Sequence, residues 1–127
     1  MLAHFVLFKP RPDLSDTERQ ALEAALVSAL SGIATIRGFR LGRRVRHGAG
    51  YEASMREDLE FAAIVEFDDL DALKAYLEHP AHKELGARFT DAVADSFIYD
   101  YEMKDGTSLG GSLEGFRVKP AASGTGV

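Results

Sequence analysis

Two histidines and a tyrosine lie close together in the segment from Tyr76 to His82, which reads Tyr-Leu-Glu-His-Pro-Ala-His. Proline lacks a backbone donor and clashes with the preceding helical turn, so Pro80 predicts that one helix ends by Glu78 and that a second begins. His82 would then lie in the first turn of the second helix, where the helix dipole disfavours the charged imidazolium. A neutral imidazole can accept a proton, so this placement favours His82 as a general base.

Each of the candidate side chains also has a structural interpretation. His82 could bond to the backbone at a helix start, and Tyr76 could pack beneath a sheet with its hydroxyl satisfied. His4 lies on an apolar strand face, where a histidine is more often a satisfied core residue than a catalyst. His79 falls at the helix junction, where capping or bracing is its simplest role.

The spacing of the two histidines raises the question of a metal site. His79 and His82 are three residues apart, with Glu78 and Glu84 close in the sequence. Imidazole and carboxylate ligands suit zinc, iron or manganese. Pro80 breaks the single helix on which this spacing would align the two rings, so we expect no metal here.

The elements that must hold these side chains are predicted by hydrophobic periodicity and by capping signals. Ser15 to Glu18 has the pattern of a capping box, and apolar residues recur after it at helical spacing. Alternating or continuous apolar runs predict strands. We expect strands over residues 3–8, 36–45, 59–67 and 96–103, and helices over 16–31, 69–78 and from 80 onward.

The order of these elements is β-α-β-β-α-β, which predicts an α+β, ferredoxin-like fold with an antiparallel four-stranded sheet and helices on one face. In the first strand, however, His4, Val6 and Phe8 alternate with Phe5 and Leu7, so both sheet faces are apolar. A second copy of the chain could cover the face without helices and close the two sheets into a dimeric α/β barrel. We expect the site to lie in the lumen between the two sheets.

Composition limits the possible functions. The chain has 127 residues, of which 46% are hydrophobic, enough for one domain with its own core. It has no cysteine, which excludes disulfides and thiolate chemistry. A formal charge of −5 argues against nucleic acid as a partner. The apolar run at the N-terminus is shorter than a signal core or a membrane span, so we expect a cytoplasmic protein that does not bind membranes.

Arg43 stands out among the five arginines around the second strand because it interrupts an apolar strand face. It could bind the carboxylate of a substrate, or it could pair with Glu66 or Asp100. We therefore keep Arg43 as a candidate for substrate binding, with an ion pair as the alternative.

The chain changes composition after Met103. Residues 104–127 are rich in glycine and serine, which is typical of a flexible extension. Three apolar residues in this extension, Leu113, Phe116 and Val118, could dock on the body of the protein. We therefore expect a domain over residues 1–103 and an extension over residues 104–127 that is partly ordered.

Three segments together resemble the stress-responsive A/B barrel (Dabb) family. They are His4 to Lys9, the segment Tyr76 to His82, and Phe97 to Tyr101, and the resemblance covers about residues 1–103. The family is similar in fold to the wider dimeric α/β-barrel group, which includes cofactor-free monooxygenases, muconolactone isomerases and chlorite dismutases. Most Dabb proteins have no assigned reaction.

The resemblance implies roles for particular residues. A plant cyclase of this family closes a linear polyketide by aldol condensation with a histidine and a tyrosine. By position in the matching segments, these roles fall on His82 and Tyr76, while His4 and His79 match further histidines and are candidates for substrate binding.

The leading hypothesis is a cofactor-independent enzyme on a small carbonyl or polyketide-like compound, of cyclase, isomerase or lyase type. In it His82 removes a proton next to a carbonyl and Tyr76 donates a hydrogen bond to the developing enolate. One alternative is a homodimer without catalytic activity, which either binds a small apolar or carbonyl-containing molecule or is associated with the stress response. Another is a cofactor-free monooxygenase of the kind found in antibiotic biosynthesis.

Overall fold

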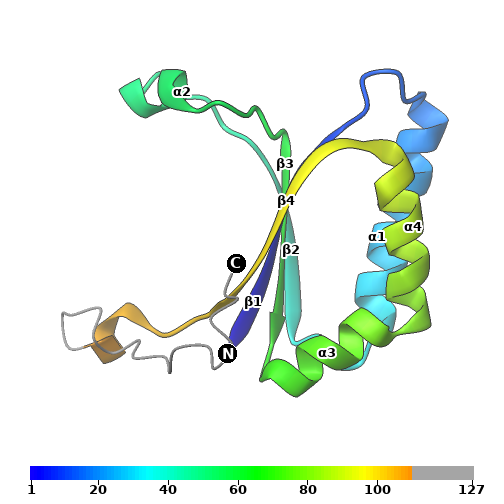
Figure 1. Ribbon diagram of the computed structural model, residues 1–127, viewed down its shortest axis with the longest axis vertical. Coiled ribbons are helices and arrows are strands. Elements are labelled where there is room, and N and C mark those ends of the chain that lie inside the picture. The colour runs from blue at the N-terminus through cyan, green and yellow to red at the C-terminus, as the bar shows by residue number, and fades with distance from the viewer. Residues whose placement is uncertain (110–127) are drawn as a thin grey trace, which may run out of the picture.

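The computed structural model describes residues 1–109 of the chain, and the expected docking of Leu113, Phe116 and Val118 lies outside them. The observed order of elements is the predicted one, with two short helices added (Figure 1). The elements are β1 (Leu2–Pro10), α1 (Asp16–Gly32), β2 (Gly38–Arg43), α2 (Gly50–Ser54), β3 (Phe61–Phe67), α3 (Leu70–Glu78), α4 (Pro80–Ala92), β4 (Val93–Glu102) and the 3-10 helix η1 (Gly106–Leu109).

The four strands form one antiparallel sheet in the order β2-β3-β1-β4. Figure 1 views this sheet on its edge, with α1, α3 and α4 on one side of it. The segments that carry α2 and η1 extend from opposite ends of the sheet towards the other side (Figure 1). The predicted ferredoxin-like fold, with an antiparallel sheet and helices on one face, is therefore confirmed.

The helices α1 and α3 begin where the sequence signals predicted. Ser15 and Glu18 form the predicted capping box, in which the Glu18 N–H donates to Ser15 Oγ over 3.1 Å and the Ser15 N–H donates to Glu18 Oε1. Asp69 caps α3 by accepting from the Ala72 N–H over 2.8 Å. These side chains satisfy donors that have no partner inside the helix, which fixes where each helix begins.

The connection between β2 and β3, for which the sequence predicted neither helix nor strand, is not a plain loop. It contains α2, whose Glu52 accepts hydrogen bonds from the N–H groups of His47 and Gly48. Gly48 has a φ of 80°, a left-handed conformation that glycine adopts without steric cost. Arg44 and Asp58 join the two ends of the connection with an ion pair of 2.6 Å. Local hydrogen bonds of this kind leave no periodic apolar signal in the sequence, which is why α2 was not expected.

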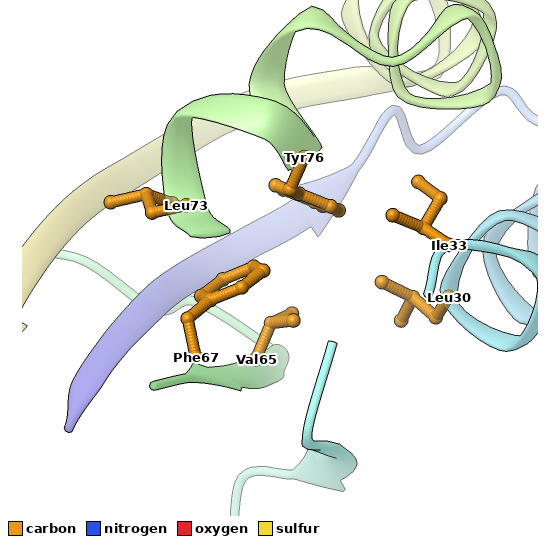
Figure 2. Close-up of a cluster of buried hydrophobic side chains, with 6 residues drawn as sticks. All are labelled: Leu30, Ile33, Val65, Phe67, Leu73 and Tyr76. Carbon is orange, nitrogen blue, oxygen red and sulfur yellow. The ribbon is translucent and has the colours of Figure 1, made fainter. Parts of the chain in front are cut away.

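The hydrophobic core lies between the sheet and the helices. Figure 2 shows its central cluster of six side chains. They come from α1 and the residue that follows it (Leu30, Ile33), from β3 (Val65, Phe67) and from α3 (Leu73, Tyr76). Val65 and Phe67 are 1% and 0% exposed. Tyr76 packs with its ring 5.1 Å from that of Phe67, so the core fixes the position of the tyrosine.

The sheet face opposite the helices carries a row of large apolar side chains. Strand pairing places Phe5 beside Tyr99 and Leu7 beside Phe97 on this face. Tyr99 and Tyr101 are about half exposed, at 53% and 51%. A contiguous apolar patch of this kind usually marks a binding surface.

No helix within residues 1–109 has the length and apolar composition to cross a membrane.

Candidate functional site

The break between α3 and α4 places the candidate residues. His79 ends α3 and begins α4, and Pro80 is the first residue of α4, as the sequence predicted. The Ala81 N–H donates to Nδ1 of His79 over 3.0 Å, so the side chain of His79 caps the second helix. The turn brings His82 back towards Tyr76, and their ring centroids lie 4.4 Å apart.

Three rings from distant parts of the chain meet at this point. The register of β1 places His4 on the sheet face that the helices cover, opposite Val65 on β3. The ring of His4 lies 5.7 Å from that of Tyr76 in an edge-on arrangement. Tyr76 therefore lies between His4 and His82, and all three side chains face one cavity.

His82 is held in a form that suits a proton acceptor. Its Nδ1 lies 3.2 Å from the Leu77 carbonyl oxygen, a group that only accepts, so Nδ1 carries the proton and donates it. Nε2 is then left with a free lone pair. Burial of the ring lowers the pKa of His82 below the ordinary 6.5; the hydrogen bond to Leu77 opposes this shift and the charge of His4 adds to it. At neutral pH the ring is a neutral base.

Tyr76 is held in a form that suits a hydrogen-bond donor. Its side chain is 3% exposed, and burial, with a smaller effect of the Asp100 carboxylate, raises its pKa to about 12. The phenol is therefore protonated throughout the neutral range. Among the hydrogen bonds of residues 1–109, none involves the Tyr76 hydroxyl, although it borders the cavity. A ligand oxygen in the cavity could accept this hydrogen bond.

Asp100 is a member of this group that the sequence analysis considered only as a partner of Arg43. It accepts a hydrogen bond from Nδ1 of His4 over 2.6 Å, while its side chain is 43% exposed and that of His4 is 6% exposed. A carboxylate that holds one ring nitrogen orients the imidazole and sets which atom faces the site. The only signal in the sequence that could have indicated Asp100 is its position as an acidic residue between the aromatic residues of the last strand.

The cavity that these residues border has a volume of about 170 Å³. Its other walls come mainly from the sheet, α1 and α4, and are apolar: Val6, Phe8, Leu30, Val65, Leu85 and Phe89. Ile98 on the edge strand β4 also lines it and is 51% exposed, so the cavity opens beside this edge. The expectation of a site in a lumen between two sheets is therefore wrong for these residues, because their strand face packs against the chain's own helices.

Arg43 lies apart from this group. It borders a second cavity, of about 460 Å³, between α1 and the β2–β3 edge of the sheet. Neither expected ion pair forms, because Glu66 bonds to Arg40 over 3.1 Å and Asp100 bonds to His4. Strand order explains this result: β1 and β3 separate Arg43 on β2 from Asp100 on β4.

His79 is not among the residues that line either cavity, and its capping bond gives it a structural role in place of the expected substrate contact.

We expect His79→Ala to lower the free energy of unfolding by about 1 kcal/mol, since the cap is lost, and to leave ligand binding and turnover unchanged. Urea denaturation measures the first effect. His79→Asn keeps a capping acceptor and should restore most of the stability. A loss of turnover at unchanged stability would return His79 to the site.

No cluster of three or more histidine, aspartate or glutamate side chains suited to a metal ion occurs within residues 1–109. The pair considered from the sequence, His79 and His82, is divided between a helix cap and the cavity wall.

Comparison with solved structures defines the class of protein. A dimeric ferredoxin-like protein of unknown function from Thermobifida fusca aligns with a TM-score of 0.65 and 20% identity, covering 80% of this chain and 90% of the other. A Dabb family protein from Mesorhizobium loti aligns with a TM-score of 0.66 and 22% identity, over 82% and 97%. Hydroxynitrile lyase from Passiflora edulis aligns with a TM-score of 0.67 and 15% identity, over 82% and 94%. These likenesses establish the ferredoxin-like fold.

The family follows from the sequence. The family model of the stress responsive A/B barrel domain (Dabb) matches residues 2–103, so the chain belongs to this family. None of the curated proteins compared with it gives a match. The resemblance noted in the sequence is thus confirmed.

Proposed function

We propose that this protein is a cofactor-independent enzyme that removes a proton from a small carbonyl compound or from its adduct. The observation that carries the proposal is that His82 Nε2 and the Tyr76 hydroxyl lie at one cavity and that neither has a hydrogen-bond partner within residues 1–109. His82 accepts the substrate proton, and Tyr76 donates a hydrogen bond to the oxygen that gains negative charge. A base and a fixed donor at one apolar cavity are the parts that such a reaction needs.

His4 and Asp100 complete the proposed site. Asp100 binds Nδ1 of His4, so the remaining nitrogen of His4 is directed away from the carboxylate and can contact the substrate. The Asp100 side chain is 43% exposed on the edge strand β4 and is not among the residues that line the cavity. His4 is therefore proposed as a substrate-binding residue and Asp100 as the residue that positions it.

The reaction class is limited by what these groups can do. Proton removal by a neutral imidazole, with the oxygen stabilised by a phenol, serves aldol cyclisation, isomerisation and cleavage of a hydroxynitrile equally. One structural neighbour is a hydroxynitrile lyase. In that reaction the base would take the hydroxyl proton, the carbon–carbon bond would break, and cyanide would leave with the bonding electrons. The cavity of about 170 Å³ suits a small reacting group.

The experiment that tests the proposal does not require the natural substrate. The purified protein is incubated in deuterium oxide with small methyl ketones and β-diketones, and exchange of the protons next to the carbonyl is followed by NMR. In parallel, cleavage of mandelonitrile is followed through the absorbance of benzaldehyde. We expect exchange or cleavage above the buffer rate, lost in the His82 variants described in the Discussion. Rates equal to buffer for every compound would contradict the proposal.

The alternative is a protein that binds a small molecule without catalysis. The observation favouring it is that His82 and Tyr76 already have structural contacts, with the Leu77 carbonyl and with Phe67. Under this alternative the same compounds would bind to the cavity, but proton exchange would match the buffer rate. Binding and exchange measured on one sample therefore separate the two functions.

We further propose that the protein is a homodimer formed through the sheet face that lacks helices. Similar structures are described as dimeric, and in this chain the face carries exposed Leu7, Phe97, Tyr99 and Tyr101. Burying this surface against a second copy would remove it from water on both chains. The cavity with His82 lies on the other side of the sheet, so each subunit would hold its own site.

Leu7→Glu should weaken this dimer by about tenfold or more, because a carboxylate without a partner would be buried at the interface. Leu7 is 39% exposed, so the substitution should not unfold the subunit. The control is Val27→Glu on α1, which is 43% exposed and lies away from this face. Sedimentation velocity over a range of concentrations measures both variants. Equal dissociation constants for Leu7→Glu and Val27→Glu would rule out this face.

A further inference from the structure

The second cavity, between α1 and the β2–β3 edge, combines apolar walls with a charged rim. Its walls are formed by Phe8, Leu22, Leu26, Leu41 and Phe61. Leu41 is 44% exposed, so the cavity is open to solvent on one side. Its volume of about 460 Å³ lies within the range of ligand pockets, roughly 300 to 1,000 Å³.

The rim of this cavity carries two arginines and one glutamate: Arg19, Glu23 and Arg43. Within residues 1–109, no ion pair includes Arg19 or Arg43. This is unusual for β2 and its extension, where Arg40 and Arg44 are paired with carboxylates. The rim therefore has an excess of positive charge on a chain whose formal charge is −5. An arginine with free donors binds a carboxylate in a two-pronged arrangement.

The two cavities adjoin each other. Phe8 and Leu26 line both of them, with the His82 cavity on one side and the arginine-rimmed cavity on the other. Arg43 pairs with Phe61 and Phe61 with Phe8, so Arg43 lies about 10 Å across the sheet from Phe8. From Phe8 to His4, four residues along β1 span about 13 Å at right angles to this direction, so the Cα atoms of Arg43 and His4 lie about 16 Å apart. The arginine side chain shortens this path, so an extended chain of medium length could reach from one cavity to the other.

We propose that the second cavity holds the far end of the substrate, an apolar chain that ends in a carboxylate bound by Arg43 and Arg19. The inference rests on the proposed function, because it names the substrate class of the His82 site: an oxo acid with its carbonyl group and its carboxylate at opposite ends. The apolar walls bury the chain, and the rim selects an anion over a neutral chain of equal length. The carbonyl end lies beside Tyr76 and His82.

The test uses three probes: 7-oxooctanoate, octanoate and octan-1-ol. Binding is followed by NMR on three groups of signals. Of these two cavities, Leu22 and Leu41 line only the second and Leu85 lines only the first, while His82 reports the proposed base. We expect 7-oxooctanoate to shift all these signals with a single dissociation constant. Octanoate should shift Leu22 and Leu41, and octan-1-ol should bind more weakly than octanoate.

Two variants and a control sharpen the test. Arg43→Gln should weaken both acids by about tenfold and leave octan-1-ol unchanged, since only a charge-assisted hydrogen bond is lost. Leu22→Trp fills the second cavity and should abolish the Leu41 shifts. Arg56→Gln removes a charge from an exposed residue outside both cavities and should change nothing.

The outcomes separate this inference from the proposed function. Shifts confined to Leu85 and His82, or an Arg43→Gln variant that binds the acids as the wild type does, would overturn the inference while proton exchange still supports the enzyme. Shifts confined to Leu22 and Leu41 with 7-oxooctanoate would overturn the single-ligand arrangement. Arg43-dependent shifts at both cavities, with no proton exchange for any compound, would support the ligand class and contradict the enzyme.

Discussion

His82→Ala should lower the rate of proton exchange or cleavage by about 10²- to 10⁴-fold, the usual contribution of a positioned general base. The expected loss is in the catalytic rate constant, because the other two histidines of this region have other proposed roles: His4, held at Nδ1 by Asp100, contacts the substrate, and Nδ1 of His79 caps α4. The measurement is deuterium exchange by NMR at saturating substrate, repeated on His82→Gln. Glutamine can still donate to the Leu77 carbonyl but cannot accept a proton at neutral pH.

The dependence of the wild-type rate on pH gives an independent check of His82. A base must be unprotonated, and burial lowers the pKa of His82 below 6.5. The rate should therefore be at its plateau at neutral pH and fall only as the pH drops below 6.5. The acid limb should be absent from the residual rate of His82→Ala.

The stability of the His82 variants decides between a catalytic and a structural role. His82 is half-buried and its ring contacts that of Tyr76 at a tilt of 56°, so we expect the melting temperature of His82→Gln to stay within a few degrees of the wild type. A fully active His82→Ala would contradict the assignment of the base. A variant that loses activity only because it unfolds would mark His82 as a structural residue of the helix junction.

Tyr76→Phe should lower the same rate by about 10²- to 10³-fold, the effect of removing one donor from an oxyanion site. The ring remains, with its contacts to Phe67 and His4, so the free energy of unfolding should change little. Because burial raises the pKa of Tyr76 to about 12, the wild-type rate should stay level through the alkaline range where an ordinary tyrosine ionises. The matched control, Tyr99→Phe, removes a hydroxyl from the opposite sheet face.

Two results would refute this role of Tyr76. The first is an unchanged catalytic rate in Tyr76→Phe, which would leave the phenol as a core residue only. The second is a large loss of stability in Tyr76→Phe, which would reveal a structural hydrogen bond of the hydroxyl. Tyr76→Ala is a poor substitute, because removal of a buried aromatic ring costs about 3 to 5 kcal/mol and confuses the two roles.

The proposed dimer and the proposed site depend on different sheet faces. Successive residues of a strand point to opposite faces, so His4 and Phe8 face the helices while Phe5 and Leu7 face the proposed partner. A variant such as Leu7→Glu should therefore separate subunits without touching the groups beside His82. Loss of activity on dissociation would show that the partner supports the site indirectly.

Local sequence signals predicted the elements well because each has a local physical cause. The Ser15 cap, the apolar repeat of α1 and the break at Pro80 act within a few residues, and the structure confirms all three. The segment around α2 was missed because its order comes from hydrogen bonds of Glu52 to nearby backbone, which periodicity does not report. The tail beyond residue 109 lies outside the described residues.

The sequence by itself determined the order of the elements, the helix break and the closeness of Tyr76 to His82, since these follow from short-range sterics and hydrogen bonding. Only the tertiary structure decided which sheet face the helices cover, and with it the cavity that the two side chains border. It also joined His4 to Asp100, 96 residues apart, and separated Arg43 from both. Such contacts depend on strand order and register, which arise from packing of the whole chain and from no local pattern.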